Sequence, residues 1–186
     1  GSNDGNVKNS HNAGTVSGGS ASSVGGVVGN NHSDVENSYN TGTVSGGDSS
    51  VSFGGVAGKN YGDIVNSHNA GAVSVGNSSA SVGGVAGYNS FGNVKNSYNA
   101  GTVSAGDNSE YVGGVTGHNS DGDVRNAYNT GAISVGVSSR SIGGVAGYND
   151  SSMKNCYNTG TVNGNYIHIG GVIGSNYGTV NNSYNT

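Results

Sequence analysis

Histidine is the residue type in this 186-residue chain best suited to binding a transition metal. His11 and His68 hold the same position of an internal repeat, but Tyr39 holds it in the repeat between them. Stacked parallel strands lie about 4.8 Å apart, which would separate the two imidazoles by about 9.6 Å, whereas Zn–N bonds are only about 2 Å long. The other histidines occupy other positions of the repeat: His32, His118 and His168. We therefore predict no metal centre.

The carboxylates give two readings. Asp34, Asp63 and Asp123 share one repeat position, and Asn93 holds it in the repeat between the last two. A row of such oxygens could bind Ca²⁺. The nonapeptide signature of calcium-binding β-rolls is absent, however. We expect solvated corner residues, with calcium binding as the alternative and no other cofactor.

Catalysis by acid–base chemistry would need carboxylates gathered in a cleft. The 10 acidic residues are instead spread along the chain, and the variable segments between repeats are too short to wall a cleft. The single cysteine, Cys156, stands at a repeat position otherwise held by Ser or Ala, which predicts a buried and inert thiol. We therefore predict that the chain is not an enzyme; a polysaccharide-acting β-helix enzyme is the alternative.

The elements that must position these residues come from a repeat. "NSYNAGTVS" at 96–104 recurs as "NSYNTGTVS" at 37–45 and "NSHNAGAVS" at 66–74. Gly-Gly pairs recur 27 to 30 residues apart, at 25–26, 54–55, 83–84, 113–114, 143–144 and 170–171. A period of this size indicates a solenoid, a propeller or an array, and propeller blades are longer, at about 40–50 residues. A β-helix with one coil per repeat fits best.

Composition supports strands over helices. Leu, Gln and Pro are absent while Gly and Asn abound, which disfavours helices, and Val, Ile, Thr and Tyr favour strands. The net charge of −4 with apolar residues at fixed places argues against disorder. Only 6 Lys and Arg argue against a nucleic-acid partner. No apolar run approaches the roughly 18 residues of a membrane span.

We predict an all-β chain folded as a right-handed parallel β-helix, with three short strands per coil of about 29 residues. In the first unit, the first strand begins near Val7, the second centres on Val16 and the third brackets the Gly-Gly pair. The other units have equivalent strands. We expect residues 1–6, which begin with Gly-Ser as expression scars do, to be a lead-in. Residues 7–186 then form one repeat domain, with units starting near 7, 35, 64, 94, 124 and 153 and a partial unit from 180.

Most asparagines fall in three columns of the repeat. The first two are Asn9, Asn37, Asn66, Asn96, Asn126, Asn155 and Asn182, and Asn12, Asn40, Asn69, Asn99, Asn129, Asn158 and Asn185. The third is Asn31, Asn60, Asn89, Asn119, Asn149 and Asn176. An amide carries both a donor and an acceptor, so stacked Asn side chains can form structural ladders along the rod. Asn also tolerates the left-handed backbone of a corner.

Aromatic residues form another column, and strand alternation should turn their rings outward. The column is His11, Tyr39, His68, Tyr98, Tyr128, Tyr157 and Tyr184, and a second, patchier stripe is Lys59, Tyr88, His118 and Tyr148. One interpretation is that the rings only stack on each other. The other is that Tyr39, Tyr98, Tyr128, Tyr157, Tyr184, Tyr88 and Tyr148 bind a glycan or a protein.

A row of hydroxyls supplies an alternative function. Thr15, Thr43, Thr102 and Thr161 share a column with Ala72 and Ala132, and the Ser17 column runs beside them. A flat Thr/Ser face could order water, as an ice-binding protein would. The two alanines interrupt that face.

The segment "VGGVAGYNSFGNVKNSYNAGTV" at 82–103 resembles the GLUG repeat, a Gly-Gly-Leu-Val-Gly motif followed by Asn, an Asn-Ser/Cys-Tyr segment and Gly-x-Val. Here Val replaces the usual Leu, and Asn12 and its column replace a usual Ala. Proteins with similar repeats are large bacterial surface proteins, namely filamentous-type adhesins and some immunoglobulin A peptidases. The resemblance implies secretion, a cell-surface location, flanking domains, and a host glycan or surface protein as partner. Exposed strand edges at the coil ends could also pair end to end with another copy.

Overall fold

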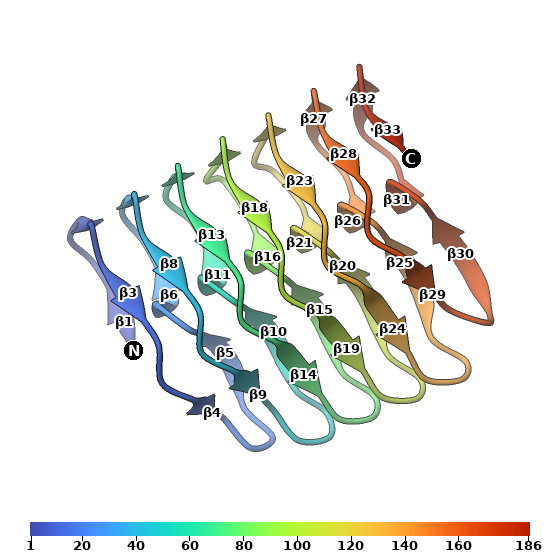
Figure 1. Cartoon of the computed structure of the whole chain (residues 1–186), viewed down its shortest axis with the longest axis horizontal. Helices are drawn as coiled ribbons and strands as arrows, with labels where there is room; N and C mark the ends of the chain where they lie inside the picture. Colours follow the sequence, from blue (N-terminus) through green and yellow to red (C-terminus); the bar gives the residue numbers. More distant parts are fainter.

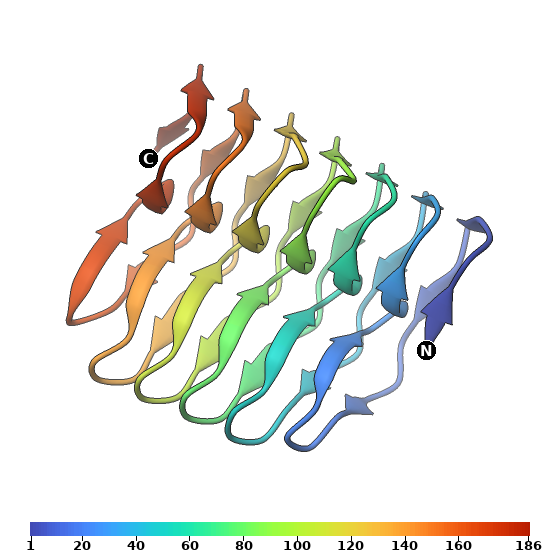
Figure 2. The same ribbon diagram turned by 180° about the vertical axis from the view of Figure 1, so that it is seen from behind.

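The computed structural model describes residues 1–186 as a solenoid of stacked coils that contains no helix (Figure 1). The N-terminus lies at one end of the stack and the C-terminus at the other. In the views from the two sides, the chain turns as a right-handed coil as it advances (Figures 1 and 2). This is the hand that parallel strand crossovers almost always adopt. No helix long and apolar enough to span a membrane occurs in it.

Five parallel sheets run along the stack, and each full coil contributes one short strand to each. Sheet A comprises β1 (Ser2–Asn3), β6 (Val28–Asn31), β11 (Ala57–Asn60), β16 (Ala86–Asn89), β21 (Thr116–Asn119), β26 (Ala146–Asn149) and β31 (Ile173–Asn176). Sheet B comprises β2 (Val7–Lys8), β7 (Val35–Glu36), β12 (Ile64–Val65), β17 (Val94–Lys95), β22 (Val124–Arg125), β27 (Ser152–Lys154) and β32 (Thr179–Asn181).

The other three sheets complete each coil. Sheet C comprises β3 (His11–Asn12), β8 (Tyr39–Asn40), β13 (His68–Asn69), β18 (Tyr98–Asn99), β23 (Tyr128–Asn129), β28 (Tyr157–Asn158) and β33 (Tyr184–Asn185). Sheet D comprises β4 (Val16–Ser17), β9 (Val44–Ser45), β14 (Val73–Val75), β19 (Val103–Ala105), β24 (Ile133–Val135) and β29 (Val162–Asn163). Sheet E comprises β5 (Ser22–Gly25), β10 (Val51–Gly54), β15 (Ala80–Gly83), β20 (Glu110–Gly113), β25 (Arg140–Gly143) and β30 (Ile167–Gly170).

The register places equivalent residues of successive repeats above one another. Tyr98 pairs with Tyr128 and Asn99 with Asn129 in sheet C, for example. This confirms the predicted parallel β-helix with one coil per repeat. β1 lies within residues 1–6, so part of the segment expected to be a lead-in already pairs with sheet A.

The predicted number of three strands per coil is wrong, because two of the three expected strands are each broken into two. The strand that opens each repeat breaks at the Asn9 column, whose residues all have a positive φ of 49° to 54°. The strand that brackets Gly-Gly breaks at that pair, between sheets E and A. A left-handed residue and a glycine bend both interrupt a strand's extended backbone, so the coil has five short sides.

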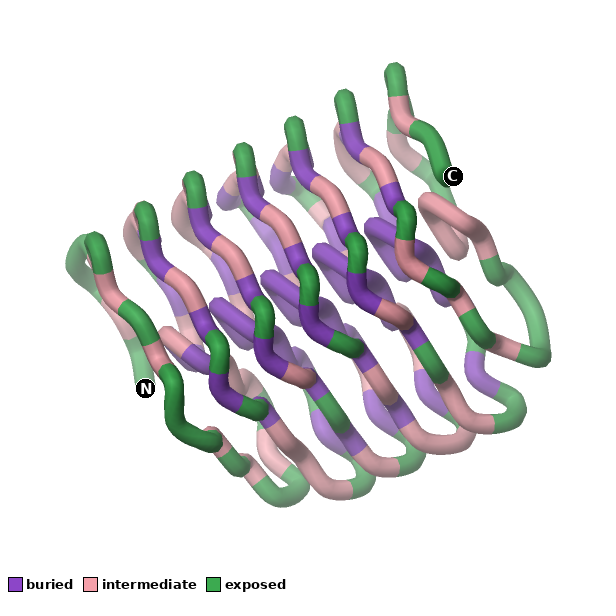
Figure 3. Tube along the Cα trace, viewed as in Figure 1, coloured by how far each residue is buried: buried purple, intermediate pink, exposed green.

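The interior contains two apolar clusters that run along the rod. Sheet B supplies Val35, Ile64 and Met153 to the first, which pack against residues of sheet A and its preceding bend. Sheets D and E face each other across the second, where Val44 and Val73 pack with Phe53. Burial is greatest in the central coils and falls at both ends of the stack (Figure 3). Each coil therefore depends on its neighbours for its core.

The second glycine of each Gly-Gly pair makes room for the Asn12 column. A Cβ atom added to Gly84 would lie 2.2 Å from Cγ of Asn99 and 2.1 Å from the carbonyl oxygen of Gly114. Neither neighbour can withdraw, because one belongs to the ladder and the other to the backbone of the next coil. The second glycine of each pair therefore leaves the space that the inner Asn side chains occupy between the two apolar clusters.

Candidate functional site

The two inner Asn columns are continuous hydrogen-bonded ladders. In the Asn12 column each Nδ2 donates to Oδ1 of the Asn in the next coil, at 2.7–2.8 Å from Asn12 to Asn185. In the central coils Nδ2 also donates to the Gly carbonyl two residues on; for Asn99 and Gly101 this distance is 2.7 Å. The side chains from Asn40 to Asn158 are fully buried. The prediction of a structural ladder is confirmed for this column.

The third column forms a second ladder of the same kind, from Asn31 to Asn176, with Nδ2 to Oδ1 distances of 2.7–2.8 Å. Asn3 extends it by one rung, donating to Asn31 at 2.8 Å. Alignment of the internal repeats did not identify Asn3, because the repeat motif around it is incomplete.

The Asn9 column differs, because it lies on the surface at a left-handed corner. Its amides bond only from Asn66 to Asn182, at 3.1–3.4 Å, and in the opposite direction along the rod. Asn9 and Asn37 form no such rung. The main role of this column is therefore conformational, and its ladder is secondary.

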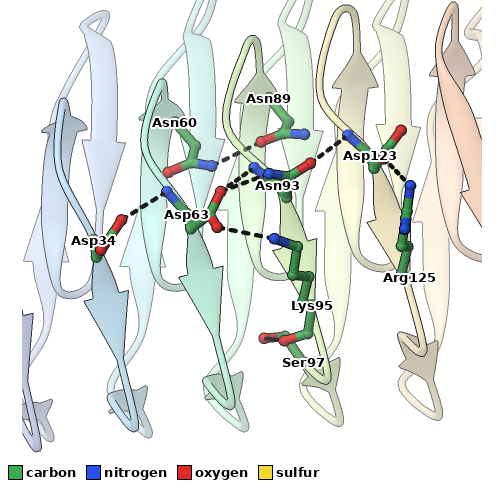
Figure 4. Close-up of polar contacts among 9 residues, drawn as sticks. All are labelled: Asp34, Asn60, Asp63, Asn89, Asn93, Lys95, Ser97, Asp123 and Arg125. Carbon is green, nitrogen blue, oxygen red and sulfur yellow. Dashed lines mark hydrogen bonds and ion pairs between the residues drawn. The ribbon is translucent and has the colours of Figure 1, made fainter.

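The Asp34 column binds backbone and cationic groups of the chain itself (Figure 4). Oδ1 of Asp63 accepts from the backbone N–H of Asn93 at 3.0 Å and from its Nδ2 at 2.7 Å, while Oδ2 accepts from Nζ of Lys95 at 3.0 Å. Arg125 pairs with Asp123 of its own coil, two residues earlier, whereas Lys95 reaches Asp63 of the preceding coil. Burial alone would raise the pKa of Asp63, but the bonds from Lys95 and Asn93 outweigh it and hold that pKa below its usual range.

The Asp63 oxygens are engaged by N–H groups, and nowhere do three or more His, Cys, Asp or Glu side chains gather at metal-binding distance. His11 and His68 lie on either side of the Tyr39 ring, each with a centroid distance of 5.1 Å. The histidines of this column are packing rings.

Cys156 lies fully buried in the apolar cluster beside sheet B. Its Sγ–H donates to the carbonyl oxygen of Lys154 at 3.3 Å. Burial raises the pKa of the thiol to about 11, although the backbone contacts oppose the shift. The thiolate is the reactive form, so a thiol that stays protonated is unreactive, and Cys156 serves as a small core residue.

Native protein should therefore resist thiol modification. We expect iodoacetamide at pH 8 to leave Cys156 unmodified in the folded chain and to alkylate it fully in guanidinium, as measured by intact mass. The denatured sample is the internal control. Rapid alkylation of the native protein would show that the thiol is accessible.

The aromatic column is a continuous stack of nearly parallel rings on the outside of sheet C. Centroid distances from His11 to Tyr184 are 4.7–5.4 Å, and interplanar angles are 2–10°. The rings of Tyr39, His68, Tyr98, Tyr128 and Tyr157 are half-buried. Because each ring covers its neighbour's face, the column presents mainly ring edges and phenol hydroxyls.

The second stripe lies on the outside of sheet A and is arranged differently. Tyr88, His118 and Tyr148 meet edge to face, with centroids 5.0 and 4.8 Å apart. Tyr111 and Tyr177, which sequence comparison missed, also join Tyr148, at 5.0 and 5.3 Å. The signal for Tyr111 is that most repeats have Ser at its position.

The Thr column faces outward beside sheet D, since Thr15, Thr43, Thr102 and Thr161 are exposed. Ala72 and Ala132 interrupt it, so no run of more than two adjacent threonines exists. The arrangement gives no argument for ice binding beyond the sequence pattern itself.

A chain built from one parallel coil repeated along an axis is a β-solenoid repeat protein. The GLUG motif matches four segments of this chain, residues 20–45, 78–104, 108–134 and 138–163. Together they cover more than half of it, and the chain belongs to the GLUG motif family. Each segment runs from the loop before sheet E through sheets A, B and C to sheet D, so the motif is one turn of the solenoid. No curated protein and no solved structure matches the chain.

Proposed function

We propose that this chain is a non-catalytic structural and adhesive module of a secreted bacterial surface protein. Its mechanism is rigid display: the solenoid holds a surface in place, and flanking domains of the parent chain supply other activities. The observation that carries the proposal is the uninterrupted outward stack from His11 to Tyr184, which keeps one geometry over the whole rod. The inner ladders support it, because they lock the register of each coil on the next.

The stacked column suits a protein partner at the host surface better than a sugar. A pyranose packs its apolar face on the face of an aromatic ring, and here the rings of Tyr98, Tyr128 and Tyr157 cover one another at 4.8 Å. Edges and hydroxyls in a regular row can instead contact a protein surface, as tyrosines do at many interfaces. Several weak contacts of this kind add up when they act together.

Replacing Tyr98, Tyr128 and Tyr157 with Ser should reduce adhesion of the purified chain to host cells at least tenfold, because the contacts are multivalent. Some stability should also be lost, since each stacked pair contributes about 0.5–1.5 kcal/mol. Adhesion would be measured by cell binding of labelled protein, and stability by thermal melting.

The matched control replaces Thr43, Thr102 and Thr161 with Ala, which changes three exposed residues of another outward column. We expect this control to bind like the wild type. Unchanged adhesion of the tyrosine variant alongside a lowered Tm would show that the column is only structural.

A further inference from the structure

Several outward side chains that depart from the repeat lie close together over sheets A and E in the last three coils. Tyr111 is the clearest departure, because Ser23, Ser52, Ser81 and Ser141 hold its position in other repeats. All of these residues have a left-handed backbone, and Tyr111 has φ 55°. A bulky residue in that conformation is strained, and such strain concentrates at functional sites. Four of the six coils carry Ser at this position and the last carries His168, so Tyr111 and His168 are its two ring-bearing departures.

The rings around Tyr111 do not cover each other as those of the stacked column do. Tyr111 meets Tyr148 at an interplanar angle of 61°, and Tyr148 meets Tyr177 at 31°. His118 lies beside Tyr111 and Tyr148. Burial lowers the pKa of His118 although Asp150 opposes the shift, so His118 is a neutral packing ring. Inclined rings leave parts of their faces free for a ligand.

These rings border a hollow of about 300 Å³, whose lining includes Tyr111, Tyr148, Tyr177, Arg140 and His168. A second hollow of about 390 Å³ is lined by Asn108, Glu110, Ser138, Arg140 and Tyr166. Arg140 belongs to both, so the two hollows adjoin across it. Each lies near the small end of the size range of ligand sites, and together they suit an extended ligand.

Arg140 and Glu110, the Arg and Glu that line the hollows, pair with each other, which favours a neutral ligand there. Nη2 of Arg140 donates to Oε1 of Glu110 at 2.7 Å, and both side chains remain partly exposed, so the pair offers donors and acceptors with little net charge. The guanidinium at the junction disfavours a cation. The Glu110 carboxylate, which is paired with it, disfavours an anion. A molecule with many hydroxyls and an apolar face matches tyrosine faces next to such a pair.

We propose that this groove binds a neutral oligosaccharide, with one sugar unit on each side of Arg140 and a pyranose face packed on the tyrosines. The site is separate from the stacked column and does not depend on its function. The largest hollow, about 410 Å³, carries no comparable argument, because it is the open cross-section of the last coil and is lined by core positions such as Gly171 and Asn185.

The test is saturation-transfer NMR with neutral tetrasaccharides of glucose, galactose, mannose and N-acetylglucosamine, alongside uronic-acid and amino-sugar tetrasaccharides. At least one neutral sugar should bind at millimolar concentration, and Tyr111→Ser and Arg140→Ala should each weaken it at least tenfold. Both variants install a residue that the repeat already uses at that position, Ser in most coils and Ala80 in the third. We therefore expect both to fold, which a melting curve would verify.

Tyr61→Ser is the matched control, because Tyr61 holds the same repeat position as Tyr177 but lies four coils away from it. Ser is tolerated there, since the repeat has Ser90 and Ser120 at the same position. This control should bind like the wild type, and so should the triple variant of the stacked column. Absence of binding by every neutral sugar, preference for the charged sugars, or unchanged binding by Tyr111→Ser would each overturn the proposal. Loss of cell adhesion by the triple variant alone bears only on the stacked column.

Discussion

Replacing Val115 with Asp should unfold the coils on either side of it. Val115 is fully buried in the apolar cluster between sheets A and B. Its backbone carbonyl accepts from Val85 at 2.9 Å and its N–H donates to Val145 at 2.8 Å, so it lies in the middle of three stacked coils. An isolated carboxylate there has no partner and costs several kcal/mol or more. That is a large part of the roughly 5–15 kcal/mol that holds a domain together.

Thermal and urea unfolding followed by circular dichroism would measure this effect. The matched control is Val51→Asp, because Val51 is 41% exposed on the outer face of sheet E. We expect the control to shift unfolding by less than about 1 kcal/mol, as surface substitutions usually do. A wild-type melting curve for Val115→Asp would mean that the side chain is not buried.

The stacking of coils was predictable because the repeat keeps polar residues in fixed columns. Asn99 and Asn129 are 30 positions apart in the chain, and the structure pairs them directly. A buried ladder tolerates no gap, since a missing rung leaves amide groups without partners. The repeat period therefore predicts how the coils stack, which amino-acid composition alone does not.

The number of strands was less predictable, because backbone angles decide where a strand breaks. Asn66 and Asn69 look alike in the sequence, yet Asn66 turns the corner with φ 50° on the surface and Asn69 lies fully buried in the ladder. The same residue type serves two purposes three positions apart. Only the direction of the chain at the corner distinguishes them.

The groove around Tyr111 could not be predicted from columns, because it joins residues of different columns. Tyr111, Tyr148 and Tyr177 hold three different repeat positions and meet only because sheets E and A adjoin at the glycine bend. The carboxylate column was similar: Lys95 reaches Asp63 across a coil, a contact that spacing along the chain hides. Contacts across columns depend on side-chain reach, which alignment of repeats does not describe.

Replacing Asn99 with Asp should destabilise the rod strongly, although the two side chains have nearly the same shape. Asn99 accepts from Nδ2 of Asn69 at 2.8 Å and donates to Oδ1 of Asn129 and to the carbonyl oxygen of Gly101, both at 2.7 Å. A carboxylate can accept but cannot donate, so it would face two acceptors in a buried site. We expect a loss of several kcal/mol at pH 7, since a buried charge without donors is costly.

The loss should depend on pH with a defined sign. Burial raises the pKa of a carboxyl in the folded state above the unfolded value of about 3.9. Below that value the Asp is protonated in both states and can donate one of the two bonds, so the variant comes closest to the wild type there. As the pH rises from about 4 toward the folded-state pKa, the unfolded state releases its proton first and the variant loses stability.

Asn96→Asp is the matched control, three positions away on the surface. Asn96 has φ 50°, which Asp also tolerates, and its bond to Asn66 is a weaker 3.3 Å. We expect this control to lose less than about 1 kcal/mol and to show little pH dependence relative to the wild type, because water solvates its carboxylate. The measurement is the difference in Tm between each variant and the wild type from pH 4 to pH 8. Equal losses in the two variants, or a loss in Asn99→Asp that does not grow with pH, would show that the buried ladder does not depend on its amide donors.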